Sequence, residues 1–181
     1  AAGACRGVRA ERGGPEPGDM KVFGLAGWSG SGKTTLLVRL IPALVARGVS
    51  VSTIKHAHHA FDVDTPGKDS HSHRLAGARE VMVSSANRFA LMHELRGAPE
   101  PKVEELVARM SPVDLLVIEG FKRHAHDKLE VHRPSLGKPL LAASDPRVVA
   151  VASDAPVPGL GVPLLALDDI ESIAGFVVAH C

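Results

Sequence analysis

The chain has 181 residues, of which 45% are hydrophobic and only 3% aromatic, with no Tyr. This length suits one α/β domain whose core is built from Ala, Val, Leu and Ile, as in a parallel sheet covered by helices. The 21 Lys and Arg nearly balance the 20 Asp and Glu and form no long basic run, which argues against nucleic acid or an anionic membrane as a main partner.

No apolar stretch approaches bilayer-spanning length, so no membrane-spanning segment is expected. The two cysteines, Cys5 and Cys181, lie near opposite ends of the chain without a pairing pattern. This favours a reducing compartment, and we expect a cytoplasmic protein. Residues 1–19 are small, charged and interrupted by Gly and Pro, so we expect a disordered extension there and one folded domain over residues 20–181.

Residues 27–34 carry the first chemical signal. They read Gly-Trp-Ser-Gly-Ser-Gly-Lys-Thr and fit the phosphate-binding pattern G-x-x-x-x-G-K-[ST]. Glycines let backbone N–H groups approach phosphate oxygens, and the start of the following helix adds unpaired N–H groups. Lys33 is expected to reach the β- and γ-phosphates, and the Thr34 hydroxyl to coordinate Mg²⁺. The residues of this segment expected to bind nucleotide are Gly27, Ser29, Gly30, Ser31, Gly32, Lys33, Thr34 and Thr35.

The flanking sequence supports this interpretation. Residues 21–26 form an apolar run typical of a buried strand, and aliphatic residues recur at helical spacing after the motif. We predict a helix from about Gly32 to Arg47, ended by Gly48 and kinked at Pro42. A second strand is predicted over residues 49–55.

Residues 56–74 are the most polar part of the chain and follow a strand's carboxyl end, where open α/β sheets bind ligands. We expect a functional loop there, with a short helix over about residues 69–76. Five histidines lie between positions 56 and 73, but their spacing matches no zinc pattern, so we expect most of them to face solvent or phosphate. Asp62 and Asp64 are candidates to hold Mg²⁺, and an exposed acidic turn is the alternative for both.

The second chemical signal is the run Asp-Leu-Leu-Val-Ile-Glu-Gly over residues 114–120. It describes a buried parallel strand that delivers Glu119 to the sheet edge near Thr34, as in a Walker B strand, whose acid orients the Mg²⁺ shell or the attacking water. We therefore expect Lys33 and Glu119 to be catalytic. The expected metal ligands are Thr34, Glu119 and Asp62.

The remaining segments are expected to complete the sheet. A hairpin over residues 80–84 and 88–93 would offer an edge for self-association, a helix is predicted over residues 99–110, and strands are predicted over residues 128–133, 148–152 and 162–167. Lys122 is expected to add positive charge near the nucleotide. Asp154 is a candidate for reading guanine, because a carboxylate there can accept hydrogen bonds from N1 and N2, although the usual Asn/Thr-Lys two residues earlier is absent. Asp168 is predicted to cap a closing helix that runs to Val178.

With these segments identified, the chain from about Met20 to Ala179 resembles the MobB family, the accessory GTP-binding proteins of molybdopterin-guanine dinucleotide biosynthesis. The phosphate-binding loop is shared by many proteins, whereas the ordered combination of motifs is specific. The matching stretches are Gly27 to Leu36, Thr53-Ile54-Lys55-His56, Phe61-Asp62-Val63-Asp64 with Gly67-Lys68-Asp69-Ser70, Arg74 with Ala76-Gly77-Ala78, Val117-Ile118-Glu119-Gly120-Phe121-Lys122, and Val151-Ala152-Ser153-Asp154.

The resemblance implies a P-loop NTPase fold: a mostly parallel sheet flanked by helices, plus a short β-hairpin addition, with a GTP-binding domain over residues 20–181. It further implies a homodimer, GTP and Mg²⁺ as ligands, slow hydrolysis of GTP to GDP and phosphate, and Lys55 as a further nucleotide contact. The implied role is to support the molybdopterin guanylyltransferase of the same pathway, with molybdopterin as a candidate second ligand.

Two other functions stay open. A small-molecule kinase uses the same loop when an acceptor pocket and an Arg-bearing lid exist, and residues 88–96 are a candidate lid, although no acceptor-binding motif is recognisable. A nickel-handling GTPase is suggested by the ten histidines. Such proteins usually place Cys with His at the metal site, and both cysteines here lie at the chain ends.

Overall fold

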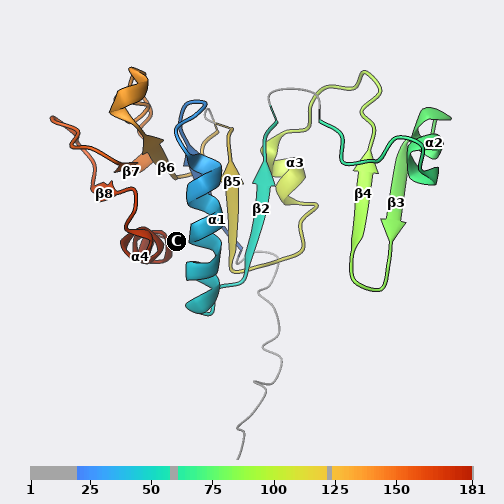
Figure 1. Cartoon of the computed structure of the whole chain (residues 1–181), viewed down its shortest axis with the longest axis horizontal. Coiled ribbons are helices and arrows are strands. Elements are labelled where there is room, and N and C mark those ends of the chain that lie inside the picture. Colours follow the sequence, from blue (N-terminus) through green and yellow to red (C-terminus); the bar gives the residue numbers. More distant parts are fainter. Residues whose placement is uncertain (1–19, 58–60, 122–123, 181) are drawn as a thin grey trace, which may run out of the picture. The chain divides into compact units, whose positions relative to one another are not determined.

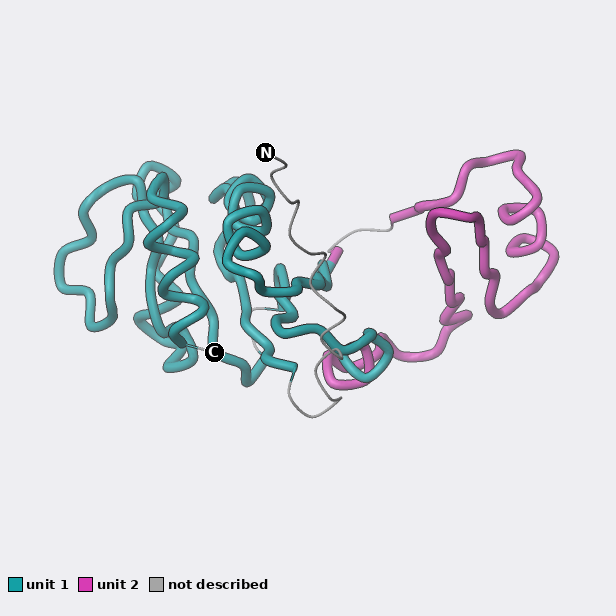
Figure 2. Tube along the Cα trace, turned by 90° about the horizontal axis from the view of Figure 1, so that it is seen from below, with its two compact units in different colours: residues 1–56, 107–181 teal, residues 57–106 magenta. Residues whose placement is uncertain are grey.

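The computed structural model describes residues 20–57, 61–121 and 124–180. The extension expected over residues 1–19 lies outside these residues, as do Lys122 and the histidines at positions 58 and 59. The chain divides into two compact units, Ala1–His56 with Val107–Cys181 and Ala57–Leu106, which Figure 2 colours separately. The assignment of residues 20–181 to one domain stays a prediction.

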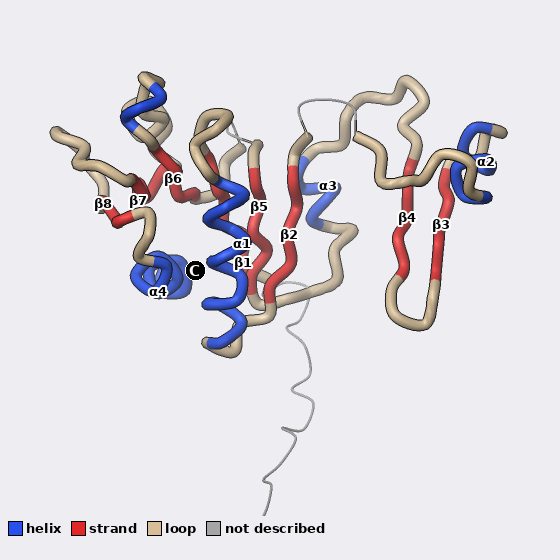
Figure 3. The backbone as a smooth tube through the Cα atoms, in the orientation of Figure 1, coloured by secondary structure: helices blue, strands red, loops and turns tan. Residues whose placement is uncertain are grey.

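The first unit contains a six-stranded sheet in which all neighbouring strands are parallel (Figures 1 and 3). The strands, in spatial order, are β2 (Val51–Lys55), β5 (Leu115–Glu119), β1 (Lys21–Ala26), β6 (Lys128–His132), β7 (Val148–Ser153) and β8 (Leu164–Ala166). β1 is therefore a central strand with β5 directly beside it. Because the strands are parallel, their carboxyl ends meet at one edge, where ligands bind in open α/β sheets.

Two helices cover one face of this sheet and pack against each other. They are α1 (Lys33–Ala46), which begins and ends close to its predicted limits, and α4 (Ile170–His180). Leu40 and Leu44 of α1 and Ile173 of α4 are fully buried against alternate strand residues. Burial of each such side chain stabilises the fold by roughly 1.5–3 kcal/mol. Aliphatic side chains therefore supply most of the stabilisation of this core, which contains few aromatic residues.

Strand β6 carries polar side chains into the interior. The alternation Lys-Leu-Glu-Val-His is typical of a half-buried strand, yet all five residues are buried. Leu129 and Val131 join the core under the helices. Glu130, whose neighbours on the strand face the helices, accepts the backbone N–H groups of Leu141 and Ala142, each at 2.9 Å. These two hydrogen bonds hold the segment between β6 and β7 against the face of β6 that points away from the helices.

Lys128 is the second buried charge of β6, with 1% of its surface exposed. Its Nζ donates to the His124 carbonyl and to Asp145 Oδ2, each at 2.8 Å. Burial opposes ionisation of Asp145, but the hydrogen bonds from Lys128 and from the Arg147 backbone hold the pKa of that carboxyl below its usual value. The ammonium and the carboxylate are therefore a matched pair, as a buried charge requires.

The helix predicted over residues 99–110 is wrong in extent, because α3 covers only Val103–Val107. Pro101 disfavours helical backbone at the residue before it, which delays the start. The Met110 N–H bonds to the Val107 carbonyl, an i→i−3 turn that ends the helix. The last strand is likewise shorter than predicted, since β8 covers Leu164–Ala166.

The predicted cap of α4 is also wrong by one residue. Asp169, and not Asp168, accepts the Ser172 backbone N–H, with 3.0 Å between Oδ1 and N. The Ser172 hydroxyl and this N–H both donate to Asp169 and lower its pKa. Asp168 instead offers its backbone carbonyl to Arg39 at 3.2 Å.

The second unit contains α2 (Asp69–Leu75) and the antiparallel pair β3 (Glu80–Ser84) and β4 (Phe89–His93). This pairing confirms the predicted hairpin outside the parallel sheet. Its side chains include the exposed Met82, Phe89 and Leu91.

Candidate functional site

The loop between β1 and α1 has the backbone that phosphate binding requires. Gly27 has φ 147°, and a Cβ there would lie 2.5 Å from the Val131 carbonyl oxygen of neighbouring β6, so only glycine fits. Gly32 is the N-cap of α1 with φ 97°, in the left-handed region that favours glycine. Ser29, Gly30, Thr34 and Thr35 are exposed and Ser31 is buried. Because α1 begins directly after this loop, the unpaired N–H groups of its first turn are next to any anion bound there.

Lys33 is held at this loop. Its Nζ donates to the Gly27 carbonyl at 3.0 Å and to the Trp28 carbonyl at 2.9 Å. The Lys33 ammonium therefore lies close to the position that an anion bound to the loop N–H groups would occupy. This is the placement that a phosphate-binding lysine needs.

Thr34 lies against the carboxyl end of β5. Its Oγ1 donates to Glu119 Oε1 at 2.7 Å. Lys55 stands opposite Glu119 in the register of β2 and β5, and its Nζ lies 3.4 Å from Thr34 Oγ1 and 3.7 Å from Glu119 Oε1. The structure thus brings Lys33, Thr34, Lys55 and Glu119 to one edge of the sheet. A hydroxyl and a carboxylate, both oxygen donors, fit the ligand preference of Mg²⁺.

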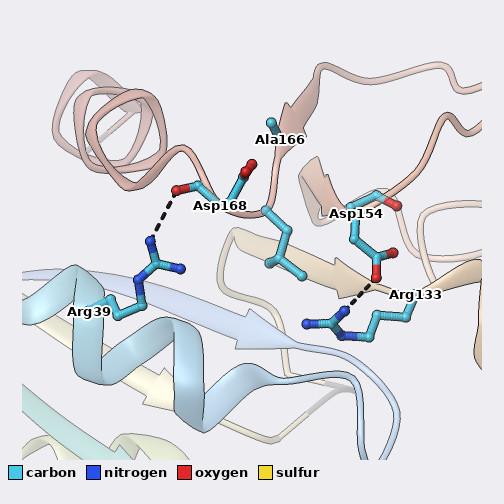
Figure 4. A pocket seen from close by; sticks show the side chains of 7 residues that line it. Arg39, Arg133, Asp154, Ala166 and Asp168 are labelled. Atoms are coloured by element: carbon cyan, nitrogen blue, oxygen red, sulfur yellow. Dashed lines mark hydrogen bonds and ion pairs between the residues drawn. The ribbon is translucent and has the colours of Figure 1, made fainter.

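Asp154 lies beside a cavity of about 320 Å³ at the carboxyl ends of β7 and β8 (Figure 4). The cavity is lined by Arg39, Arg133, Ser153, Asp154, Ala166, Leu167 and Asp168. The Arg133 guanidinium forms an ion pair with the Asp154 carboxylate. It also donates through Nε to the Ser31 carbonyl of the phosphate-binding loop, at 3.0 Å. The cavity and the loop therefore share one side chain.

Asp62 belongs to the second unit, where its carboxylate is already engaged. It accepts the Asp64 backbone N–H at 2.9 Å and lies 2.6 Å from an Arg74 guanidinium nitrogen. These two hydrogen bonds, the backbone one first, lower the pKa of Asp62. Arg74 also pairs with Asp64 at 3.5 Å and with Glu94 at 3.3 Å. The assignment of Asp62 to Mg²⁺ stays a prediction.

Sequence reasoning does not find two parts of the site, the contacts of Arg133 and those of Trp28. The sequence indicates Arg133 only as the end of a predicted strand. Because β6 is a direct neighbour of β1, Arg133 follows β6 at the same edge of the sheet as the phosphate-binding loop. The Trp28 indole N–H donates to the Pro139 carbonyl at 2.8 Å, and the Lys138 ammonium lies 5.9 Å from the Trp28 ring centroid. No periodic signal links residue 28 to residues 138 and 139.

Within residues 20–57, 61–121 and 124–180 no group of three or more His, Cys, Asp or Glu side chains could hold a metal ion. The same described residues contain no helix that is both long and apolar enough to cross a membrane.

A central parallel strand that leads through a glycine-rich loop into a helix, with an acidic strand end beside it, defines a P-loop NTPase fold. Residues 22–154 match the family described as molybdopterin guanine dinucleotide synthesis protein B. The chain belongs to this MobB family.

Relatives cover most of the chain. It is 47% identical to a molybdopterin-guanine dinucleotide biosynthesis adapter protein of Escherichia coli K12 over 162 residues, which is 88% of this chain and 92% of the relative. It is 40% identical to the protein of that name in Haemophilus influenzae Rd, over 87% of this chain and 88% of the relative. A crystal structure of a molybdopterin-guanine biosynthesis protein B superposes with a TM-score of 0.70 and 26% identity, covering 88% of this chain and 99% of the other.

Proposed function

We propose that this protein binds GTP with Mg²⁺ at residues 27–35, hydrolyses GTP slowly to GDP and phosphate, and acts as an accessory adapter in molybdopterin-guanine dinucleotide biosynthesis. The observation that carries the nucleotide part is the contact between Thr34 and Glu119 at the end of the phosphate-binding loop. The pathway is supported by the family and by the adapter relatives from two bacteria.

Each residue of the site has a distinct task in this proposal. The loop N–H groups and Lys33 would bind the phosphates. Thr34 with Glu119 would hold Mg²⁺, which would supply positive charge next to the phosphates. Lys55, beside Glu119, offsets the negative charge of the carboxylate and adds a cation for the phosphates.

Slow hydrolysis has a basis in composition. GTPases that hydrolyse quickly use a Gln to orient the attacking water or an arginine finger to stabilise charge. The chain contains no Gln, so no side chain of this type can orient water. The lack of a water-orienting Gln favours a nucleotide-dependent adapter role over rapid turnover.

The partner proposed is the molybdopterin guanylyltransferase of the pathway, in the cytoplasm, with molybdopterin as a candidate second ligand. Asp154 is the proposed guanine-reading residue, since it lies at the cavity next to the loop. A homodimer is proposed through the β3–β4 hairpin, whose exposed apolar side chains favour self-association.

The test is a titration of the purified protein with fluorescent GTP and ATP, each with and without Mg²⁺. Tighter, Mg²⁺-dependent binding of GTP is expected. A preference for ATP, with a phosphorylated acceptor accumulating, would replace this proposal with the small-molecule kinase.

A further inference from the structure

Arg133 contacts two parts of the site that are distant in sequence. Its Nε donates to the backbone carbonyl of Ser31. Its terminal N–H pairs with the Asp154 carboxylate (Figure 4). A guanidinium is planar and its donors have a fixed geometry. The Asp154 carboxylate and the Ser31 carbonyl are therefore bound by two donors of one rigid group.

The Ser31 carbonyl needs this donor. Ser31 is 1% exposed and precedes Gly32, whose carbonyl accepts the first helical hydrogen bond of α1, from the Leu36 N–H at 2.9 Å. A buried carbonyl left without a donor is costly, and Arg133 supplies the donor. A Cβ built on Gly32 would lie 3.5 Å from the guanidinium, so Arg133 also packs on the residue just before Lys33.

We propose that Arg133 is a positioning residue that couples the cavity around Asp154 to the phosphate-binding loop, so that the state of the Asp154 carboxylate sets the affinity of the loop for phosphate. This inference rests on the proposed nucleotide binding and deepens it. A base bound in the cavity would then influence the triphosphate end of the same ligand through one side chain.

A purely electrostatic role predicts the opposite sign. The two side chains are 36% and 38% exposed, so their ion pair contributes little to stability. If Arg133 and Asp154 act only as charges, removing the negative charge of Asp154 makes the loop more positive and strengthens phosphate binding. Coupling through geometry instead weakens phosphate binding, because asparagine offers only a neutral acceptor and the charge-assisted hydrogen bond that fixes Arg133 on Ser31 is lost.

Asp168 provides the matched control. It lines the same cavity and its backbone carbonyl bonds to Arg39 rather than to Arg133 (Figure 4). Asp168→Asn therefore removes the same charge from the same cavity without changing the contact to the loop.

The experiment is calorimetric titration of the full chain with sodium tripolyphosphate and Mg²⁺, and in parallel with GTP and Mg²⁺. Tripolyphosphate carries no base, so a change in the cavity reaches it only through the protein. Asp154→Asn is expected to bind tripolyphosphate about threefold or more weakly than Asp168→Asn. In an Arg133→Lys background the two substitutions should give equal affinities, because lysine keeps the charge but offers no rigid fork for both partners.

A tripolyphosphate affinity of Asp154→Asn equal to or higher than that of Asp168→Asn, in the otherwise wild-type chain, would overturn the coupling and leave nucleotide binding standing. A difference between them that persists with Arg133→Lys would also overturn it, since Arg133 would then not be the link. A wild-type chain that binds neither tripolyphosphate nor GTP would overturn the proposed function and this inference together.

Discussion

The Thr34 hydroxyl donates a hydrogen bond to the Glu119 carboxylate across 85 positions of sequence, with 2.7 Å between the two oxygens. The contact exists because β1 and β5 are neighbours, with Leu25 paired to Glu119 at the end of the ladder. The start of α1 and the end of β5 therefore meet, and two sequence motifs become one polar site. Glu119 is 6% exposed, so its carboxylate depends on Thr34 and Lys55 for part of its solvation.

Glu119→Gln should separate catalysis from binding. Gln keeps an oxygen that can accept from Thr34 but lacks the negative charge that favours Mg²⁺. We expect Mg²⁺-dependent GTP hydrolysis to fall by about 100-fold while GTP affinity changes by less than about threefold. Single-turnover hydrolysis and equilibrium titration measure the two quantities. Equal losses in both would make Glu119 a binding or structural residue.

Lys33→Ala should remove tight nucleotide binding and leave the fold intact. The substitution deletes a charge-assisted donor to the phosphates, which corresponds to about a 10- to 100-fold loss of GTP affinity. Lys21→Ala is the control, because Lys21 is exposed at the amino end of β1, away from the loop that follows the carboxyl end. Unchanged GTP affinity in Lys33→Ala would refute the assignment of the loop.

The ion pair of the buried Lys128 and the partly exposed Asp145 should respond asymmetrically to substitution. Asp145→Ala leaves the ammonium buried without its carboxylate and should cost about 3–5 kcal/mol of unfolding free energy. Lys128→Met should cost less, because Asp145, with 25% of its side chain exposed, can be hydrated. Urea denaturation of both variants and of the double variant measures the difference. A larger cost for Lys128→Met would show that packing, not charge, dominates at this position.

His126 should make stability depend on pH. Its ring packs on β1, since a Cβ on Gly24 would lie 2.5 Å from Nε2. Burial, followed by the nearby charge of Lys128 and by His124, lowers the pKa of His126 from 6.5 to about 4. Between these two values the unfolded chain binds a proton that the folded chain does not. Stability should therefore fall as pH decreases through this window.

His126→Gln removes this contribution and should flatten the dependence of the urea midpoint on pH between about pH 7 and pH 4.5. The ring C2 proton of His126, assigned by its loss in that variant, should titrate near pH 4 in an NMR series. Titration near the ordinary histidine pKa would contradict the buried placement of the ring.

The cap of α4 provides a local test. Asp169→Ala should lower the melting temperature by about 2–4 °C, because the Ser172 N–H loses its acceptor at the start of the helix. Asp168→Ala, which leaves its backbone bond to Arg39 in place, should change the melting temperature much less. A larger effect at Asp168 would support the cap predicted from sequence instead.

Several elements could be predicted because local patterns specify them. The glycines and Lys33 in the loop, the leucines of α1 and the aliphatic run of β5 each carry a signal within a dozen residues. The hairpin was equally predictable from its two short strands and the turn between them. These patterns are sufficient to assign the parallel α/β architecture and the site edge.

The features that the sequence does not specify depend on contacts between distant segments. The alternation of β6 predicts a strand but not the burial of its polar residues, which a later segment makes possible by supplying N–H groups to Glu130 and a carboxylate to Lys128. Asp168 and Asp169 are chemically identical candidates for a cap, and the register of the chain entering α4 selects between them. Arg133 becomes part of the site through strand order, which residue types alone do not reveal.

Residues 137–145 contain no helix or strand, and by that criterion they look like a place to insert a tag or a cleavage sequence. Their backbone N–H groups nevertheless bind Glu130, their Asp145 pairs with Lys128, and Pro139 holds the only tryptophan of the chain. An insertion there would open a passage for water to the charges of Glu130 and Lys128, and would release the Trp28 indole of the phosphate-binding loop. This irregular segment therefore has the sequence tolerance of a core element rather than that of a surface loop.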